Sequence, residues 1–264
     1  MLANQRVFVE AISKYCRAHE IAMKFGSSGW LIVMQRGERR HLAFGYDVGL
    51  NSAAAHQIAS DKAATAELLG MSGVPCIPHT LFLGPKRGSY VPDPGSSEAM
   101  LGLLADHPAG IVVKPNEGTS GECVFMATSR AELERAVTAI FAAYPSLAIS
   151  PYVSIENEIR VVLIDDVPLV VYGKKRGADW RHNLDLGAQP ILVEAGDIRD
   201  ACIGIAVRAA RAIGIRFASI DVVRVNGAWK ILEINSGVKM EALGRQHPEL
   251  VYSAYGAALD KVFE

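Results

Sequence analysis

Two carboxylates and an amide stand on a predicted hairpin near the end of the chain. The segments FASIDVVRV and WKILEIN flank the turn residues Asn226 and Gly227, a dipeptide typical of tight β-hairpins. Asp221 and Glu233 are 12 residues apart and centred on that turn, so antiparallel pairing places them roughly opposite each other. Asn235 follows Glu233 by two residues and therefore points to the same face.

The strand residues around these polar side chains are apolar, which makes a plain surface hairpin the weaker interpretation. Burying carboxylates without a partner is costly, and two carboxylates with an amide oxygen repel one another unless a cation lies between them. Oxygen-only ligands suit Mg²⁺, which keeps water and substrate phosphate in its shell. We therefore predict a metal site at Asp221, Glu233 and Asn235. The alternative is a solvent-facing hairpin whose acids are merely hydrated.

A second polar stretch, VVKPNEGTSGECV, has the residue types that bind phosphate. Lys114 ends an apolar strand, and the loop after it offers backbone N–H groups and hydroxyls from Gly118, Thr119, Ser120 and Gly121. Glycine permits close approach and a positive φ. The loop matches neither GxxxxGK[ST] nor GxGxxG, so the two commonest nucleotide motifs are absent, and such a loop alone is more often an ordinary turn.

Bulk composition narrows the class of protein. The chain has 264 residues, 50% hydrophobic and 21% charged, with a formal net charge of −1, which argues against broad nucleic-acid or anionic-membrane binding. No apolar run approaches the ~20 residues of a spanning helix, and the first residues carry charges where a signal peptide has its apolar core. The four cysteines are scattered without a CxxC pair. We expect a cytoplasmic protein without nucleic-acid or membrane partners.

Hydrophobic periodicity and turn signals predict a mixed α/β chain in which antiparallel pairs dominate the second half. Gly and Pro exclude a regular element from residues 84–97. SRAE is a capping box that opens a helix to about residue 144, and Asp197 is expected to cap a helix to about residue 213. Besides the final hairpin, the other predicted elements are helices at 6–18 and 53–70 and strands at 21–25, 30–35, 41–46, 110–115, 148–153, 158–164 and 167–173.

Six segments, read in order, resemble the ATP-grasp superfamily: IASDKAAT, IVVKPNEGTSG, NEIRVVLIDDVPL, DWRHNLDLGA, IDVV and ILEINSGVKME. They look most like the branch of ribosomal-protein glutamate ligase, glutathione synthetase and cyanophycin synthetase. The resemblance implies an α+β ATP-grasp fold, two α+β subdomains clamping ATP, with a shortened N-terminal α/β portion. We expect divisions at 1–50, 51–150 and 151–264. The shortened N-terminal portion has two equal explanations: either a partner subunit completes the cleft, or the portion is simply truncated.

The resemblance implies a nucleotide site. Lys62 and Lys114 would hold ATP phosphates, and the GTSG loop would cover the β- and γ-phosphates. Glu158 would accept from the ribose hydroxyls. The adenine would meet the backbone of ISPYV, which contributes Ser150, Tyr152 and Val153.

The same resemblance assigns the reacting end. Asp221, Glu233 and Asn235 match magnesium ligands, with Glu233 bridging two ions and Mn²⁺ able to substitute. Arg181 and Asn183 match residues close to the transferred phosphate and acyl group, and Arg160 would contact phosphate or substrate. A basic residue also precedes that segment; we carry over Lys175, although Lys174 and Arg176 compete for the position.

The implied activity is an ADP-forming ligation. ATP phosphorylates a carboxylate to an acyl phosphate, an amine attacks, phosphate leaves and an amide results. The substrates would be a small-molecule carboxylate and amine, one of them an amino acid or small peptide, and the resemblance alone suggests a homo-oligomer. The alternatives are a kinase that stops at phosphoryl transfer and a nucleotide-binding module without chemistry. Lys239 stands where relatives have glycine, and either binds an anionic substrate group or is an exposed loop lysine.

Overall fold

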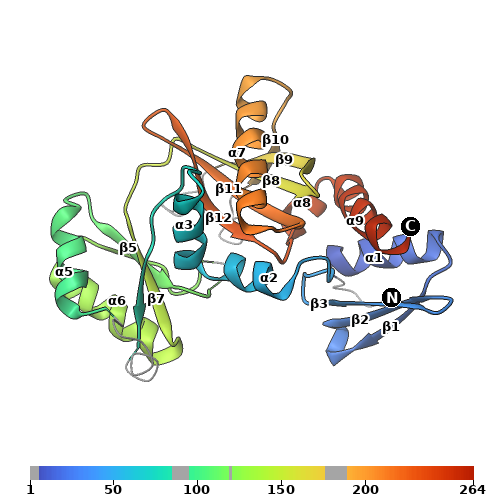
Figure 1. Cartoon of the computed structure of the whole chain (residues 1–264), viewed down its shortest axis with the longest axis horizontal. Coiled ribbons are helices and arrows are strands. Elements are labelled where there is room, and N and C mark those ends of the chain that lie inside the picture. The colour runs from blue at the N-terminus through green and yellow to red at the C-terminus, as the bar shows by residue number, and fades with distance from the viewer. Residues whose placement is uncertain (1–5, 85–94, 119–120, 176–188) are drawn as a thin grey trace.

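The computed structural model describes residues 6–84, 95–118, 121–175 and 189–264. Three units follow one another across the molecule, and the N- and C-terminal ends lie at the same end of it (Figure 1). Every pairing between the named strands of the described residues is antiparallel, which confirms the prediction for the second half and extends it to the first. None of the helices in these ranges is both long and apolar enough to cross a bilayer.

The N-terminal unit is one helix and a three-stranded sheet, as expected. It contains α1 (Val7–Ala18), β1 (Ala22–Gly26), the short 3-10 helix η1 (Ser27–Gly29), β2 (Leu31–Arg36) and β3 (Arg39–Phe44). α1 packs beside the last helix, α9 (Pro248–Phe263) (Figure 1). The rings of Phe8 and Tyr255 meet edge-on at 5.0 Å inside a shared hydrophobic core. The unit is therefore fixed to the C-terminal part of the chain.

The second unit is a four-stranded sheet in the order β4-β7-β5-β6. Its elements are β4 (Thr80–Leu83), α5 (Ser97–Asp106), β5 (Ile111–Pro115), β6 (Phe125–Ala127), α6 (Arg130–Ala143) and β7 (Ser146–Pro151). The predicted capping box is confirmed, because Ser129 accepts from the backbone of Glu132 and Glu132 accepts from the backbone of Ser129. Most of the predicted loop at 84–97 lies outside the described residues.

The third unit is a five-stranded sheet in the order β10-β9-β8-β11-β12. Its elements are β8 (Asn157–Ile164), β9 (Val167–Lys175), β10 (Gln189–Leu192), α7 (Asp197–Ile213), β11 (Phe217–Val225), β12 (Ala228–Asn235) and α8 (Glu241–Gly244). α7 covers one face, whereas α1 and α9 pack on part of the other. Asp197 is the first residue of α7 and not its cap, because Gly196 occupies that position.

The single helix predicted at 53–70 is wrong in one respect: it is two helices. α2 (Ala53–Ser60) ends at Asp61, and α3 (Lys62–Met71) begins directly after it. Asp61 has an extended backbone, and its carboxylate accepts a 2.8 Å hydrogen bond from the N–H of Ala64, which is the geometry of a helix N-cap. The break puts Lys62 at the N-terminus of a helix.

Candidate nucleotide and phosphoryl-transfer site

A cleft of about 810 Å³ is bordered by all three units. Strands β5 and β7 supply one wall, strands β8, β9, β11 and β12 supply another, and α2 with the start of α3 lies between them. Residues of the N-terminal unit line it as well. Its volume is near the upper end of ordinary small-molecule pockets, about 300–1,000 Å³. The cleft therefore has room for a nucleotide and a second substrate.

A β-bulge in the final hairpin brings Asp221 opposite Glu233. The turn sets a register in which Val222 pairs with Ile231, and without a shift Asp221 would pair with Leu232. The pairing slips by one residue at that point, so Asp221 faces Glu233 as the spacing predicts. All three metal candidates, Asn235 included, line the cleft.

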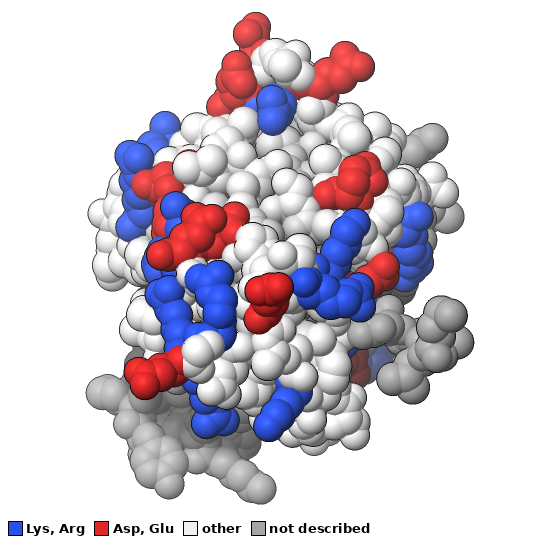
Figure 2. Space-filling model, turned by 90° about the vertical axis from the view of Figure 1, so that its right-hand side faces the viewer, with Lys and Arg blue, Asp and Glu red and all other residues white. Residues whose placement is uncertain are grey.

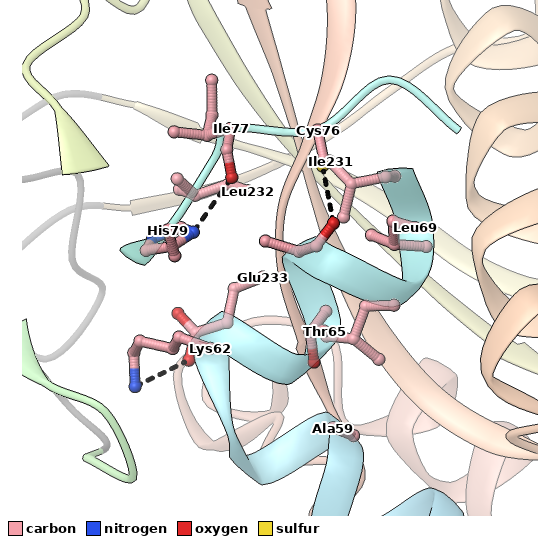
Figure 3. Close-up of a pocket in the computed structure, with 12 residues that line it drawn as sticks. Ala59, Lys62, Thr65, Leu69, Cys76, Ile77, His79, Ile231, Leu232 and Glu233 are labelled. Atoms are coloured by element: carbon pink, nitrogen blue, oxygen red, sulfur yellow. Dashed lines mark hydrogen bonds and ion pairs between the residues drawn. The ribbon is translucent and has the colours of Figure 1, made fainter. Parts of the chain in front are cut away.

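Lys62 links the glycine-rich loop to the hairpin. Its ammonium donates to the carbonyl oxygen of Gly118 at 2.7 Å. Figure 3 shows the same side chain beside Glu233, whose carboxylate is 3.9 Å from the ammonium. Asn116 fixes the helix that carries it, since the Asn116 carbonyl accepts from the N–H of Lys62 and its side chain accepts from Ala63. Asn116 was not singled out by sequence reasoning, although it sits inside the quoted loop.

Lys114 is buried on β5 and faces the same cleft. Burial lowers the pKa of its ammonium to about 8; Glu233 opposes this shift and Lys62 adds to it. Burial, and then Lys114, also hold the pKa of His79 well below its usual range. His79 donates from Nδ1 to the carbonyl of Ile77 at 2.9 Å (Figure 3), so it is a neutral neighbour of two lysines.

The lowered pKa of Lys114 predicts a pH-dependent nucleotide affinity. A phosphate binds the protonated lysine, so the Kd for ADP should be constant below about pH 8 and rise up to about tenfold per pH unit above it. The Lys114→Arg variant keeps its charge throughout and should show a flat profile, measured by calorimetry. An equal rise in both proteins would assign the titration to another group.

Four buried charges form a network across the neighbouring strands β9, β8 and β11. Arg160 donates both of its hydrogen bonds to Asp221 at 2.7 Å, and Lys174 lies 2.9 Å from Asp221 and also contacts Glu158. Burial opposes ionisation of Asp221, but Arg160 and Lys174 hold its pKa well below the usual range. Burial raises the pKa of Glu158 despite Lys174. Glu158, Arg160 and Asp221, for which the ATP-grasp resemblance implies ribose, phosphate and magnesium contacts, are therefore already bonded to one another or to Lys174.

Strand alternation explains how this network reaches the cleft. One face of β8 carries every second residue from Glu158 to Ile164. At one end of this face Glu158 and Arg160 line the cleft. At the other end Val162 and Ile164 join the core that α1 and α9 cover. Arg160 and Asp221 are direct partners in the β8–β11 register.

The structure brings together most of the predicted residues that it describes. Of the three competing basic residues, Lys174 lies in the cleft, buried, whereas Arg176 and the side chain of Lys175 lie outside the description. Thr119, Ser120, Arg181 and Asn183 are also outside the described residues. The remaining nucleotide candidates that line the cleft are Gly118, Gly121, Ser150, Tyr152 and Val153.

The donor chemistry of the cleft fits an oxygen-ligated divalent ion. The described residues contain no cluster of three or more His, Cys, Asp and Glu side chains, which suits an ion held by one or two carboxylates, an amide oxygen, water and substrate phosphate. Glu233 and Asn235 both line the cleft, and the printed ion pair of Glu233 among the described residues is the long one, 3.9 Å, to Lys62. The side-chain nitrogen of Asn235 is buried without a hydrogen-bond partner there, so the amide oxygen and not this donor would be the ligand. Asp221 would have to share its carboxylate with Arg160.

Charge on the end of the molecule formed by the N-terminal unit is mixed. Basic and acidic side chains alternate over the face shown in Figure 2, and no single sign dominates it. Figure 2 therefore shows no continuous basic patch among the described residues of this face.

Comparison with known proteins gives concordant matches. The RimK-like ATP-grasp domain matches residues 59–248. A Legionella pneumophila (strain Paris) protein named "probable alpha-L-glutamate ligase" is 27% identical over 197 residues, which are 74% of this chain and 61% of that protein. The chain thus spans about three-fifths of the length of such relatives.

Two solved structures show the likeness in fold. The D-alanine–D-alanine ligase of Bacillus anthracis complexed with ATP has a TM-score of 0.62 at 16% identity, over 80% of this chain and 68% of that one. A bifunctional glutathione synthetase of Pasteurella multocida has a TM-score of 0.58 at 12% identity, over 96% and 44%. The predicted α+β clamp fold is confirmed.

Proposed function

The chain belongs to the RimK-like ATP-grasp family, and we propose that it is an ATP-dependent, ADP-forming ligase that joins a carboxylate to an amine. The observation that carries the proposal is one cleft in which Lys62, Lys114 and Glu233 lie next to the buried Arg160–Asp221 pair. The relatives' printed name, alpha-L-glutamate ligase, supports an amino acid as one substrate.

The residues of the cleft suit phosphoryl transfer followed by amide formation. Two lysines neutralise the negative charge that spreads over the transferring phosphoryl oxygens. The backbone of Ser150–Val153 on the opposite wall would hold the adenine, and Glu158 would reach the ribose when its contact with Lys174 loosens. The carboxylate attacks the γ-phosphorus, ADP leaves, and the amine then displaces phosphate from the acyl group. Arg181 and Asn183 would stabilise the oxyanion of that second step.

A magnesium ion would be held by Glu233, Asn235 and Asp221, and Mn²⁺ could replace it. When bound, the ion neutralises phosphate charge and orients the triphosphate. We also propose, from the family resemblance alone, that the protein forms a homo-oligomer.

Hydroxylamine distinguishes this ligase from a kinase. With ATP, magnesium and a panel of amino acids and dipeptides, the protein should form a hydroxamate and ADP in equal amounts, because hydroxylamine intercepts an acyl phosphate. A stable phosphorylated product without hydroxamate would instead support the kinase. Absence of ADP with every carboxylate would leave only a nucleotide-binding module.

A further inference from the structure

The N-terminal unit places large aromatic side chains at one end of the cleft. Trp30 is 47% exposed and Phe44 is 61% exposed, and both line the cleft together with Tyr46. Apolar side chains left open in a binding cleft mark a surface that a ligand covers. None of these residues belongs to the nucleotide or metal candidates.

The aromatic wall is held rigidly from behind. Arg6 donates to the carbonyl oxygens of Gly45, at 3.0 Å, and Gly29, so it ties together the two turns that carry the aromatic rings. Its guanidinium lies 4.4 Å from the ring centre of Trp30 and 5.3 Å from that of Tyr46. A wall fixed in this way loses little conformational entropy when a ligand packs on it.

Groups of both charge signs border the wall. Asp47 pairs with His56 at 2.8 Å, and Lys239 follows the β11–β12 hairpin. All three residues line the same cleft. An amino acid or peptide end has an ammonium and a carboxylate, which such a border accommodates. A second carboxylate, as in glutamate, would be stripped of water against aromatic rings, and that is costly.

We propose that Trp30, Phe44 and Tyr46 form the subsite for the side chain of the second substrate, and that this substrate is an amino acid or short peptide with an apolar, aromatic-sized side chain. The inference rests on the proposed ligase function and narrows its substrate class. The three aromatic residues line the same cleft as Lys114 and Glu233, so a substrate held by them would occupy the cleft that also holds the nucleotide candidates.

The test compares substrates and matched variants. The wild-type kcat/KM should be at least about tenfold higher for phenylalanine, leucine and dipeptides that contain them than for glutamate and dipeptides that contain glutamate. Trp30→Ala and Phe44→Ala should each raise KM for the apolar substrates about tenfold and leave KM for ATP unchanged. Phe25→Ala and Leu42→Ala remove exposed apolar side chains of the same sheet outside the cleft and should change neither constant.

Calorimetry with the same panel, in the presence of ADP and magnesium, tests the aromatic subsite independently of the ligase function. Apolar ligands that bind wild type and lose about tenfold in Trp30→Ala would support the subsite even if no amide forms, and then only the ligase function fails. The subsite would be overturned if wild type used or bound glutamate-containing ligands as well as apolar ones, and if Trp30→Ala and Phe44→Ala kept the wild-type affinity for apolar ligands. That result would leave the proposed ligase function intact.

Discussion

Glu233→Gln is expected to lower turnover at saturating ATP and magnesium by at least about 100-fold while the protein stays folded. The substitution keeps size and shape but removes the negative charge that lies 3.9 Å from the ammonium of Lys62 and that counteracts the lowering of the Lys114 pKa by burial. The effect on folding should be below about 1 kcal/mol, because the ion pair is long, 3.9 Å, and the carboxylate is partly exposed.

The matched control is Glu134→Gln, which removes a carboxylate of the exposed α6 surface that pairs with Arg130. It should leave turnover unchanged. Steady-state kinetics across a magnesium titration, with a thermal melt of each variant, give both readouts. Near-normal turnover of Glu233→Gln at high magnesium would remove this carboxylate from the reaction.

Asp221→Leu is expected to lower the free energy of unfolding by about 3–5 kcal/mol. It leaves the buried cations Arg160 and Lys174 with a single carboxylate, Glu158, whose own pKa is raised by burial. Urea denaturation at neutral pH measures the loss, because the depressed pKa of Asp221 keeps the wild-type carboxylate ionised there.

A second variant separates stability from chemistry. Arg160→Met combined with Asp221→Leu removes both charges of the bidentate pair, and apolar replacement of such a pair is often close to neutral. The double variant should regain most of the stability but none of the turnover. Stability of Asp221→Leu within about 1 kcal/mol of wild type would show that the network carries little of the fold.

Local sequence signals predicted much of the framework. The turn at Asn226 and the 12-residue spacing predicted Asp221 roughly opposite Glu233, one residue from the register that the turn alone sets, and alternation predicted Asn235 on the same face. The ATP-grasp fold was implied by the resemblance of six segments to that superfamily, and it is confirmed. Periodicity and turn signals predicted the antiparallel pairs of the second half, which the structure contains. The break between α2 and α3 had a signal too, since aspartate is a favoured N-cap, but the apolar pattern continued through Asp61 and hid it.

The long-range contacts could not be read in this way. Arg160 meets Asp221 because β8 and β11 are neighbours, although β9, β10 and α7 lie between them in the chain. The bulge at Leu232 depends on packing, since Ile231 and Ile234 both join the core beneath α7. The aromatic wall depends on Arg6, which joins the turns at Gly29 and Gly45 from 23 and 39 residues away, and no local motif encodes these contacts.

The most direct test of the ligase uses a carboxylate substrate labelled with ¹⁸O. In the proposed reaction one carboxylate oxygen attacks the γ-phosphorus and stays with phosphorus when the amine displaces phosphate. The inorganic phosphate released with each amide should therefore carry one ¹⁸O atom, as mass spectrometry would show. Phosphate without label, formed alongside the amide, would contradict an acyl-phosphate ligase.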